Sequence, residues 1–102
     1  MALAKAALTA SAAAIYTSSG NSAVTTIYFC NYSGTDRTVT VHLVASGDSA
    51  DNTNIIYQAI PVVAGDTYVL DTEKVILANG DSIQALASAT ASIAASVSYI
   101  GV

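Results

Sequence analysis

The chain has 102 residues, of which 53% are hydrophobic and only 10% are charged, and its formal net charge is −4. This length supports one domain with a single modest core, and three scattered basic residues cannot neutralise a run of phosphates, so nucleic-acid binding is not expected. One cysteine excludes an internal disulfide, and no apolar stretch is long enough to span a membrane.

The first fourteen residues, MALAKAALTASAAA, are predicted to form an N-terminal arm. Alanine permits a helical turn or two there. The match to a secretion signal is poor, because Thr9 and Ser11 interrupt a short apolar part. An alanine-rich, nearly uncharged terminus rarely orders itself in water. We therefore expect residues 1–14 to be held either by the protein's own sheet or by a neighbouring subunit.

Eight short stretches after residue 14 have the composition or the alternation of β-strands. They are separated by turn-forming residues at intervals of about 8 to 12 residues. The predicted strands are Ala14–Ser18, Ser22–Tyr32, Arg37–Ala45, Ile55–Ile60, Thr67–Asp71, Val75–Leu77, Ile83–Ala87 and Ser92–Ile100. Between them, Ser46–Asn54 is the longest polar loop and is expected to be exposed and mobile.

The last predicted strand alternates strictly between two faces. One face carries Ile93, Ala95, Val97 and Tyr99, and the other carries Ser92, Ala94, Ser96 and Ser98. Ile93, Val97 and Tyr99 are therefore expected to be mostly buried.

The strongest reversal signal in the chain is Asn79-Gly80-Asp81, because asparagine and glycine accept positive φ at little cost. It separates the run Val75–Leu77 from the run Ile83–Ala87. The region Gly65–Ile100 is interpreted as the closing part of an antiparallel sheet.

Together these strands predict an all-β fold, an antiparallel β-sandwich of seven to eight short strands in which residues 15–102 form a single domain. Immunoglobulin-like and small jelly-roll topologies both remain open. An immunoglobulin domain proper is not expected, since the chain has no cysteine pair and no tryptophan. Only Pro61 and a few charges protect the sheet edges, so the edges are predicted to be available for pairing with other chains.

Two residues of chemically versatile type are predicted to be inactive. His42 falls on the polar face of Arg37–Ala45, where an exposed histidine is favoured over a metal ligand because no second histidine or cysteine pattern accompanies it. Cys30 lies in the apolar run Ile27–Cys30 and is interpreted as a small buried hydrophobe.

The acidic residues sit mostly beside glycine, serine, asparagine or threonine and are interpreted as turn formers. They are Asp36, Asp48, Asp51, Asp66, Asp71, Glu73 and Asp81. No Asp-x-Asp-x-Asp-Gly spacing indicates a calcium site.

Six tyrosines could form a sugar-binding platform, but half-buried positions within strands are the favoured interpretation. They are Tyr16, Tyr28, Tyr32, Tyr57, Tyr68 and Tyr99. Asn31-Tyr32-Ser33 matches a glycosylation acceptor, which is a pattern common by chance.

No phosphate-binding glycine loop, no Gly-x-Ser-x-Gly elbow and no cluster of histidine with carboxylates occurs in the sequence. The chain is therefore predicted not to be an enzyme. No catalytic, cofactor-binding or metal-binding residue is assigned.

Several turns and strands follow one another in a distinctive order. An Asn31-x-Ser33-Gly34 turn precedes RTVTVHLV at Arg37–Val44, AGDT follows at Ala64–Thr67, and Leu77, Gly80, Asp81 and Ile83 precede VSY at Val97–Tyr99. This series, which covers residues 15–102, resembles small virion structural proteins of tailed bacteriophages.

The resemblance implies a non-enzymatic β-sandwich protein of the virion, present in multiple copies. A capsid cement or decoration protein is the first expectation, and a neck, tail or baseplate component is the alternative. The implied partners are capsid or tail subunits and copies of the chain itself, with neither nucleic acid nor a membrane. A receptor- or glycan-binding module on the virion surface is the competing class. Such a module should carry aromatic residues on loops at one end of the sandwich.

Overall fold

The computed structural model describes residues 2–70, 75–89 and 92–101, and this part of the chain contains strands and turns without a helix. The strands are β1 (Ala2–Ala7), β2 (Ala13–Thr17), β3 (Ser22–Asn31), β4 (Arg37–Val44), β5 (Ile55–Val62), β6 (Thr67–Leu70), β7 (Val75–Leu77), β8 (Ser82–Ala87) and β9 (Ile93–Gly101). The predicted all-β class is confirmed, with nine strands in place of seven or eight.

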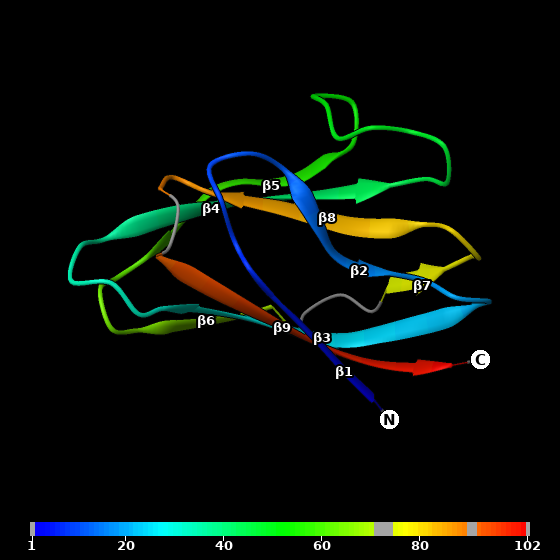
Figure 1. The fold of residues 1–102 in the computed structure, drawn as a ribbon, viewed down its shortest axis with the longest axis horizontal. Helices are drawn as coiled ribbons and strands as arrows, with labels where there is room; N and C mark the ends of the chain where they lie inside the picture. The colour runs from blue at the N-terminus through cyan, green and yellow to red at the C-terminus, as the bar shows by residue number, and fades with distance from the viewer. Residues whose placement is uncertain (1, 71–74, 90–91, 102) are drawn as a thin grey trace.

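The strands form two antiparallel sheets that pack face to face (Figure 1). The first sheet has the order β1-β9-β3-β6, with β7 also pairing with β3, and the second has the order β2-β8-β4-β5. The pairs are nested along the chain, from β4 with β5 outward to β1 with β9. Nested pairs divided between two sheets are the connectivity of a jelly roll. Of the two topologies left open by the sequence, the strand order fits the jelly roll and not the immunoglobulin arrangement.

All eight predicted strands are present, with ends shifted by at most two residues in the described part of the chain. The largest shift is in β5, which continues through Pro61 to Val62. Proline is tolerated there because β5 is an edge strand, where a backbone donor is dispensable. Asp71, predicted to end a strand, lies outside the described residues.

The predicted N-terminal arm is tied into the sandwich at its first strand. β1 pairs along β9 from Ala2 opposite Tyr99 to Ala7 opposite Ala94, and Leu8 is buried in the core. The helical turns permitted by alanine do not form, because the ladder with β9 and the burial of Leu8 outweigh a weak intrinsic propensity. Residues 1–14 were expected to be held either by the protein's own sheet or by a neighbouring subunit, and the structure shows pairing with the protein's own sheet.

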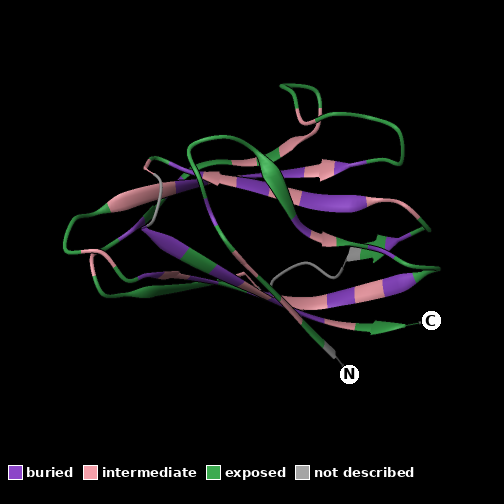
Figure 2. Ribbon diagram, in the orientation of Figure 1, coloured by how far each residue is buried: buried purple, intermediate pink, exposed green. Residues whose placement is uncertain are grey.

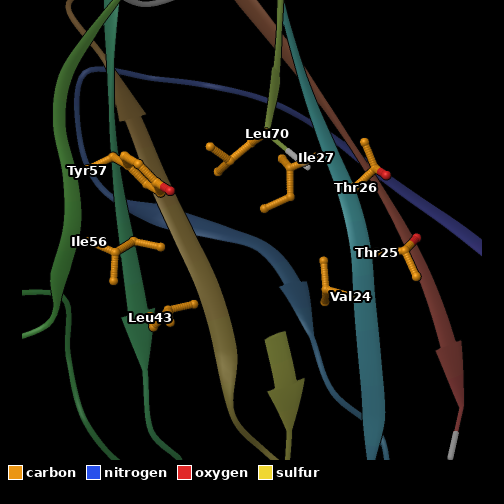
Figure 3. Close-up of a pocket in the computed structure, with 8 residues that line it drawn as sticks. All are labelled: Val24, Thr25, Thr26, Ile27, Leu43, Ile56, Tyr57 and Leu70. Carbon is orange, nitrogen blue, oxygen red and sulfur yellow. The ribbon is translucent and has the colours of Figure 1, made fainter. Parts of the chain in front are cut away.

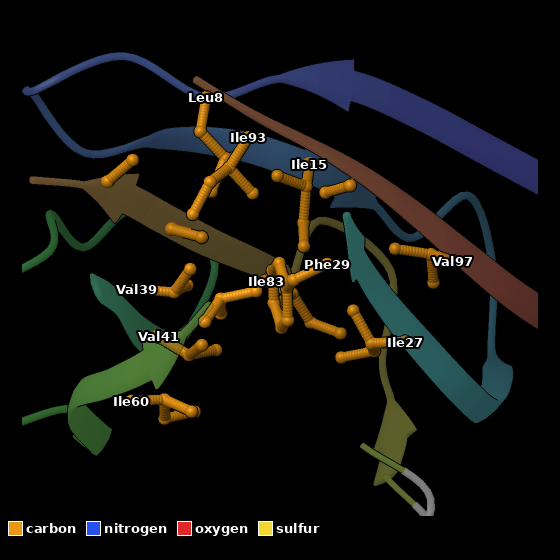
Figure 4. Packing of buried hydrophobic residues seen from close by; sticks show 14 of the residues in the cluster. Leu8, Ile15, Ile27, Phe29, Val39, Val41, Ile60, Ile83, Ile93 and Val97 are labelled. Atoms are coloured by element: carbon orange, nitrogen blue, oxygen red, sulfur yellow. The ribbon is translucent and has the colours of Figure 1, made fainter. Parts of the chain in front are cut away.

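The core lies between the sheets, and its side chains come from both of them (Figure 4). Burial alternates along the strands, as the pleat requires (Figure 2). The largest fully buried apolar side chains are Phe29, Ile83, Ile93, Val39, Val41 and Val97. Three alanines, Ala85, Ala87 and Ala95, are buried in the same cluster.

The predicted alternation along β9 is confirmed, but two serines assigned to the outward face, Ser92 and Ser98, are buried. Ile93, Ala95 and Val97 are buried and Tyr99 is half-buried. Ser98 is on the opposite face as predicted, yet it is also buried. Thr25 lies at a bulge in β3, and its Oγ1 is 3.1 Å from both the carbonyl oxygen and the hydroxyl of Ser98. The Thr25 side chain therefore covers Ser98.

The turn at Asn79-Gly80 reverses the chain as predicted, but it does not join two neighbours in one sheet. β7 belongs to the first sheet and β8 to the second, so the interpretation of Gly65–Ile100 as the close of a single sheet is wrong. The turn is fixed from outside, since Asn79 Oδ1 accepts a hydrogen bond from the Gly20 amide at 2.8 Å and the Gly80 amide donates to the Ser18 carbonyl at 2.9 Å. Local turn signals give the reversal and not the sheet to which the next strand is added.

Candidate interaction surface

The outward side of the first sheet is a nearly uncharged surface built from four rows of side chains. Residues paired across an antiparallel ladder share a face, so the strand register defines each row. The rows are Ala7–Ala94–Cys30–Thr67, Lys5–Ser96–Tyr28–Val69, Leu3–Ser98–Thr26 and Ile100–Ala23–Ile76. We call these residues the outer face of the first sheet.

This outer face concentrates the exposed apolar side chains of the described residues. Five of the nine large hydrophobic residues that are exposed belong to it, namely Leu3, Tyr28, Val69, Ile76 and Ile100. Leu3 is 74% exposed and Ile76 is 68% exposed, which is unusual for large aliphatic residues within strands. The only charged side chain in the four rows is Lys5. A sheet that must face water normally alternates to polar residues on that side, and here serine and threonine are the only polar types besides Lys5.

Small side chains along β1 and β9 leave a shallow groove of about 410 Å³ in this region. Its lining is Lys5, Ala6, Ala7, Ala94, Ala95 and Ser96. Because alanine covers little of the backbone, another chain could approach β1 and β9 closely along this groove.

The size of the outer face limits what one copy can bind. Four strands at a spacing of ~4.8 Å and eight residues at a rise of ~3.3 Å give a projected area of roughly 500 Å². A stable pairwise interface buries roughly 800 Å² on each partner. A single copy using this face alone would therefore bind weakly, whereas many copies on one assembly could bind tightly through avidity.

One cavity inside the sandwich is far smaller than the groove along β1 and β9. The cavity between β3 and β6 of the first sheet and β4 and β5 of the second has a volume of about 30 Å³ (Figure 3). It is lined by Val24, Thr25, Thr26, Ile27, Leu43, Ile56, Tyr57 and Leu70. This is the space of roughly one water molecule, well below the roughly 300 Å³ at which small-molecule pockets begin.

His42 is buried, so the prediction of an exposed histidine is wrong. Its side chain does lie on the outward side of β4, in register with Gln84 and Ile55. The loop after β4 returns over it, and the imidazole Nδ1 is 2.8 Å from Asn54 Oδ1. Most of residues 45–53 are themselves exposed, as predicted for this loop. Alternation correctly predicted the face of His42, but it contains no information about a loop that covers that face.

Cys30 is half-buried on the outer face of the first sheet, and not a core residue as predicted. The continuous apolar run Ile27–Cys30 suggested burial throughout. In the structure Ile27 and Phe29 point to the core while Tyr28 and Cys30 point outward. In the described part of the chain, no group of three or more histidine, cysteine, aspartate or glutamate side chains could hold a metal ion.

The interpretation of the acidic residues as turn formers holds in part, because Asp51, Asp66 and Asp81 accept hydrogen bonds from local backbone amides, while Asp36 and Asp81 accept them from amides that are distant in sequence. Asp81 accepts hydrogen bonds from the amides of Ser46 and Ala78, both at 3.0 Å. Asp36 accepts one from the Ala64 amide at 3.0 Å. Hydrogen bonds from the side chain and the amide of Thr53 lower the pKa of Asp51. Asp71 and Glu73 lie outside the described residues.

The tyrosines do not gather on loops. Tyr32 is the one tyrosine outside a strand. Tyr16 and Tyr99 stack with ring centroids 4.2 Å apart, joining β2 of the second sheet to β9 of the first. The Tyr16 hydroxyl donates to Ser22 Oγ at 2.9 Å. Tyr16, Tyr57 and Tyr99 are half-buried strand residues as interpreted, whereas Tyr28, Tyr32 and Tyr68 are exposed.

Asn31 is unsuitable as a glycosylation acceptor despite its sequence motif. Its side chain is fully buried, and Nδ2 donates to the carbonyl oxygens of Thr35 and Val62, both at 2.9 Å. Both amide hydrogens are therefore already used inside the protein.

The residues that form the outer face were not singled out from the sequence. Leu3, Lys5 and Ala7 do alternate with Ala4 and Ala6, but alanine favours a helix over a strand, so this pattern has little weight. Ile76 lies in a run of only three residues, which is too short to show alternation.

None of the described residues forms a helix long and apolar enough to cross a membrane. Comparisons of the chain with protein-family models, with curated proteins and with solved structures gave no match.

Proposed function

We propose that this protein is a non-enzymatic structural module that docks in many copies onto a larger assembly through the outer face of its first sheet. The observation that carries the proposal is the exposure of Leu3, Tyr28, Val69, Ile76 and Ile100 on a face whose only charged side chain, among the described residues, is Lys5. Exposed apolar surface concentrated on one face of a domain is typical of a protein interface. The contacts should therefore be mainly apolar and should persist at moderate salt.

The assembly we propose is the virion of a tailed bacteriophage, with the protein as a capsid cement or decoration protein. The order of turn and strand motifs from Asn31 to Tyr99 supports this choice. The jelly-roll connectivity is compatible with it, because jelly rolls occur in viral capsid proteins. They also occur in lectins, so the fold alone does not select the function.

A position in the neck, tail or baseplate is the second candidate, because the same face could dock there. A glycan-binding module finds less support, because only Tyr32 is placed on a loop and the cavity between β3 and β6 of the first sheet and β4 and β5 of the second holds about one water.

Copy number in purified particles tests the proposal. Quantitative gel analysis of particles from the phage that encodes this chain should show hundreds of copies per particle for a shell component. A few to dozens of copies would place it in the neck, tail or baseplate. Absence from particles washed at moderate salt would contradict a structural role in the virion.

A further inference from the structure

The four edges of the two sheets differ in how well they are protected against pairing with another strand. An unpaired edge strand presents free backbone amides and carbonyls, and natural proteins block such edges with proline, bulges, very short strands or charged side chains, especially lysine. The edge strands are β1 on one side of the first sheet, β6 and the three-residue β7 on its other side, and β2 and β5 in the second sheet.

Three of these edges are blocked in the part of the chain that the structure describes. β5 contains Pro61, two register shifts against β4 and a left-handed residue, Ala59, with φ of 54°. β2 is broken by a bulge between Ala14 and Tyr16. β6 is only four residues long.

β1 has only one of these devices, the charged side chain of Lys5. It is six residues long, contains neither proline nor glycine, and pairs with β9 without a register shift. The Leu8 amide donates to the Ile93 carbonyl at 2.9 Å, which fixes the direction of the ladder. Because donors alternate along an antiparallel strand, Ala4 and Ala6 also face β9. The backbone groups of Leu3, Lys5 and Ala7 therefore point away from β9, along an edge where the described residues supply no neighbouring strand.

We infer that β1 is a pairing edge for a second copy of this chain, and that two copies join β1 to β1 antiparallel about a two-fold axis. A second copy is the occupant that fits, since its own β1 is equally regular and equally open while its other edges are blocked. Two-fold contacts of this self-complementary kind are the commonest in protein oligomers.

The register follows from comparing the number of backbone hydrogen bonds between the two β1 strands with the repulsion between their lysines. With Lys5 opposite Lys5 of the second copy, Leu3 lies opposite Ala7 on both sides, and each opposed pair exchanges two backbone hydrogen bonds, giving about six. Sliding by two residues would separate the lysines but would lose one of these pairs within β1. Two solvated lysine side chains repel only weakly, so the additional backbone bonds decide in favour of the centred register.

The pairing would extend the proposed docking surface. The four-strand-wide outer face of one copy would continue into that of the next, doubling a projected area of roughly 500 Å². A doubled face reaches the size of a stable interface. This consequence rests on the proposed function, whereas the pair itself can be tested with the purified chain alone.

The experiment is sedimentation equilibrium of the purified protein at concentrations up to ~1 mM, with three variants at Lys5. Lys5→Pro removes an outward amide that the ladder with β9 does not use, and it should shift the dissociation constant at least about tenfold toward monomer. Lys5→Ala removes the repulsion and should tighten the dimer by roughly twofold. Raising salt should also tighten the wild-type dimer, which is opposite to the effect on an ionic interface.

A mixture of wild type and Lys5→Glu provides a test that does not depend on a folding defect. Native mass spectrometry at low salt should show more mixed dimer than the statistical share, because the mixed pair places Lys5 opposite a carboxylate. A statistical mixture would overturn the centred register. A wild-type protein that stays monomeric at ~1 mM, or a dimer that Lys5→Pro leaves unchanged, would overturn the pairing at β1.

The variant Ala94→Lys separates this inference from the proposed function. Ala94 lies on β9, one strand in from the open edge, so this change should leave the dimer intact while it disturbs docking of the outer face. Loss of docking with an intact dimer supports both statements. An intact dimer with unchanged docking would contradict the docking proposal alone, and a monomeric wild type that still docks would contradict the pairing alone.

Discussion

Asn31 is the residue on which one end of the sandwich depends. Its Nδ2 donates to the carbonyls of Thr35 and Val62, and its Oδ1 accepts from the amide and the hydroxyl of Ser33. Its backbone amide donates to Asp66, and its carbonyl accepts from Gly65. One buried side chain therefore fixes the turn after β3 and the turn after β5, which are distant in sequence.

Asn31→Asp should lower the free energy of unfolding by about 2–4 kcal/mol, measured by urea denaturation at neutral pH. The substitution keeps the shape of the side chain but replaces two donors with a carboxylate oxygen that faces two carbonyls. Asn52→Asp, at an exposed position in the loop before β5, is the matched control and should change stability by less than about 0.5 kcal/mol. Equal effects of the two substitutions would show that the buried network contributes little.

For individual residues, the face of a strand could be predicted from the sequence, but the contacts that cover that face could not. Alternation gave the correct face for Val97 and for His42, since the pleat is a local property. It could not show that Asn54 covers His42 or that Thr25 covers Ser98, because those contacts depend on loops and bulges that no local pattern encodes. The role of Asn31 could not be predicted either, because the motif Asn31-Tyr32-Ser33 looks the same whether the asparagine is buried in a strand or accepts a glycan.

Among the elements, the turn between β7 and β8 carries the strictest steric requirement. Gly80 has φ of 88°, a left-handed conformation that favours glycine. A Cβ atom at this position would lie 2.6 Å from Ser46 Oγ and 3.0 Å from Ser46 Cβ. The turn is thus packed against the loop after β4, where Asp81 also accepts a hydrogen bond from the Ser46 amide.

Gly80→Ala should destabilise the protein more than Gly65→Ala, as measured by thermal or urea unfolding. Gly65 has a similar φ of 77° but open space around it, so alanine there costs only the left-handed strain of about 1–2 kcal/mol. At Gly80 the contact with Ser46 adds to this cost. Combining Gly80→Ala with Ser46→Gly should remove the added part. Identical losses at the two glycines, or no recovery in the double variant, would contradict this account of the turn.

At the scale of elements, eight strands were predicted because their composition, alternation and turns agreed. β1 was not, because alanine is the strongest helix former and is depleted in strands, so the composition of this segment pointed away from a strand. The position of β7 and β8 in different sheets was also beyond prediction. A turn sequence specifies a reversal, while the choice of sheet depends on docking of that turn against Ser18 and Gly20.

For the whole molecule, the sequence left two topologies open, and the nested pairing of β1 to β9 decided between them. This choice depends on pairings between residues as distant as Ala2 and Tyr99, which local patterns do not reveal. The same long-range pairing creates the outer face, since Leu3, Tyr28, Val69 and Ile76 come from four different strands. The surface on which the proposed function depends could therefore not be predicted before the pairing of the strands was known.

We propose that the outer face of the first sheet docks onto a larger assembly, and a pair of matched lysine substitutions tests this docking most directly. Ala94 is an exposed alanine on β9 within this face, and Ala14 is an exposed alanine on β2 of the second sheet. Both variants should retain near-native stability by thermal unfolding, because both side chains already contact solvent.

The measurement is the occupancy of each variant when purified protein is added to phage particles that lack it. Burying an unpaired lysine in an apolar contact is costly, so Ala94→Lys should lose at least about tenfold in apparent affinity. Ala14→Lys should bind like wild type. Equal binding of the two variants, or loss of binding by Ala14→Lys alone, would contradict docking through the outer face of the first sheet.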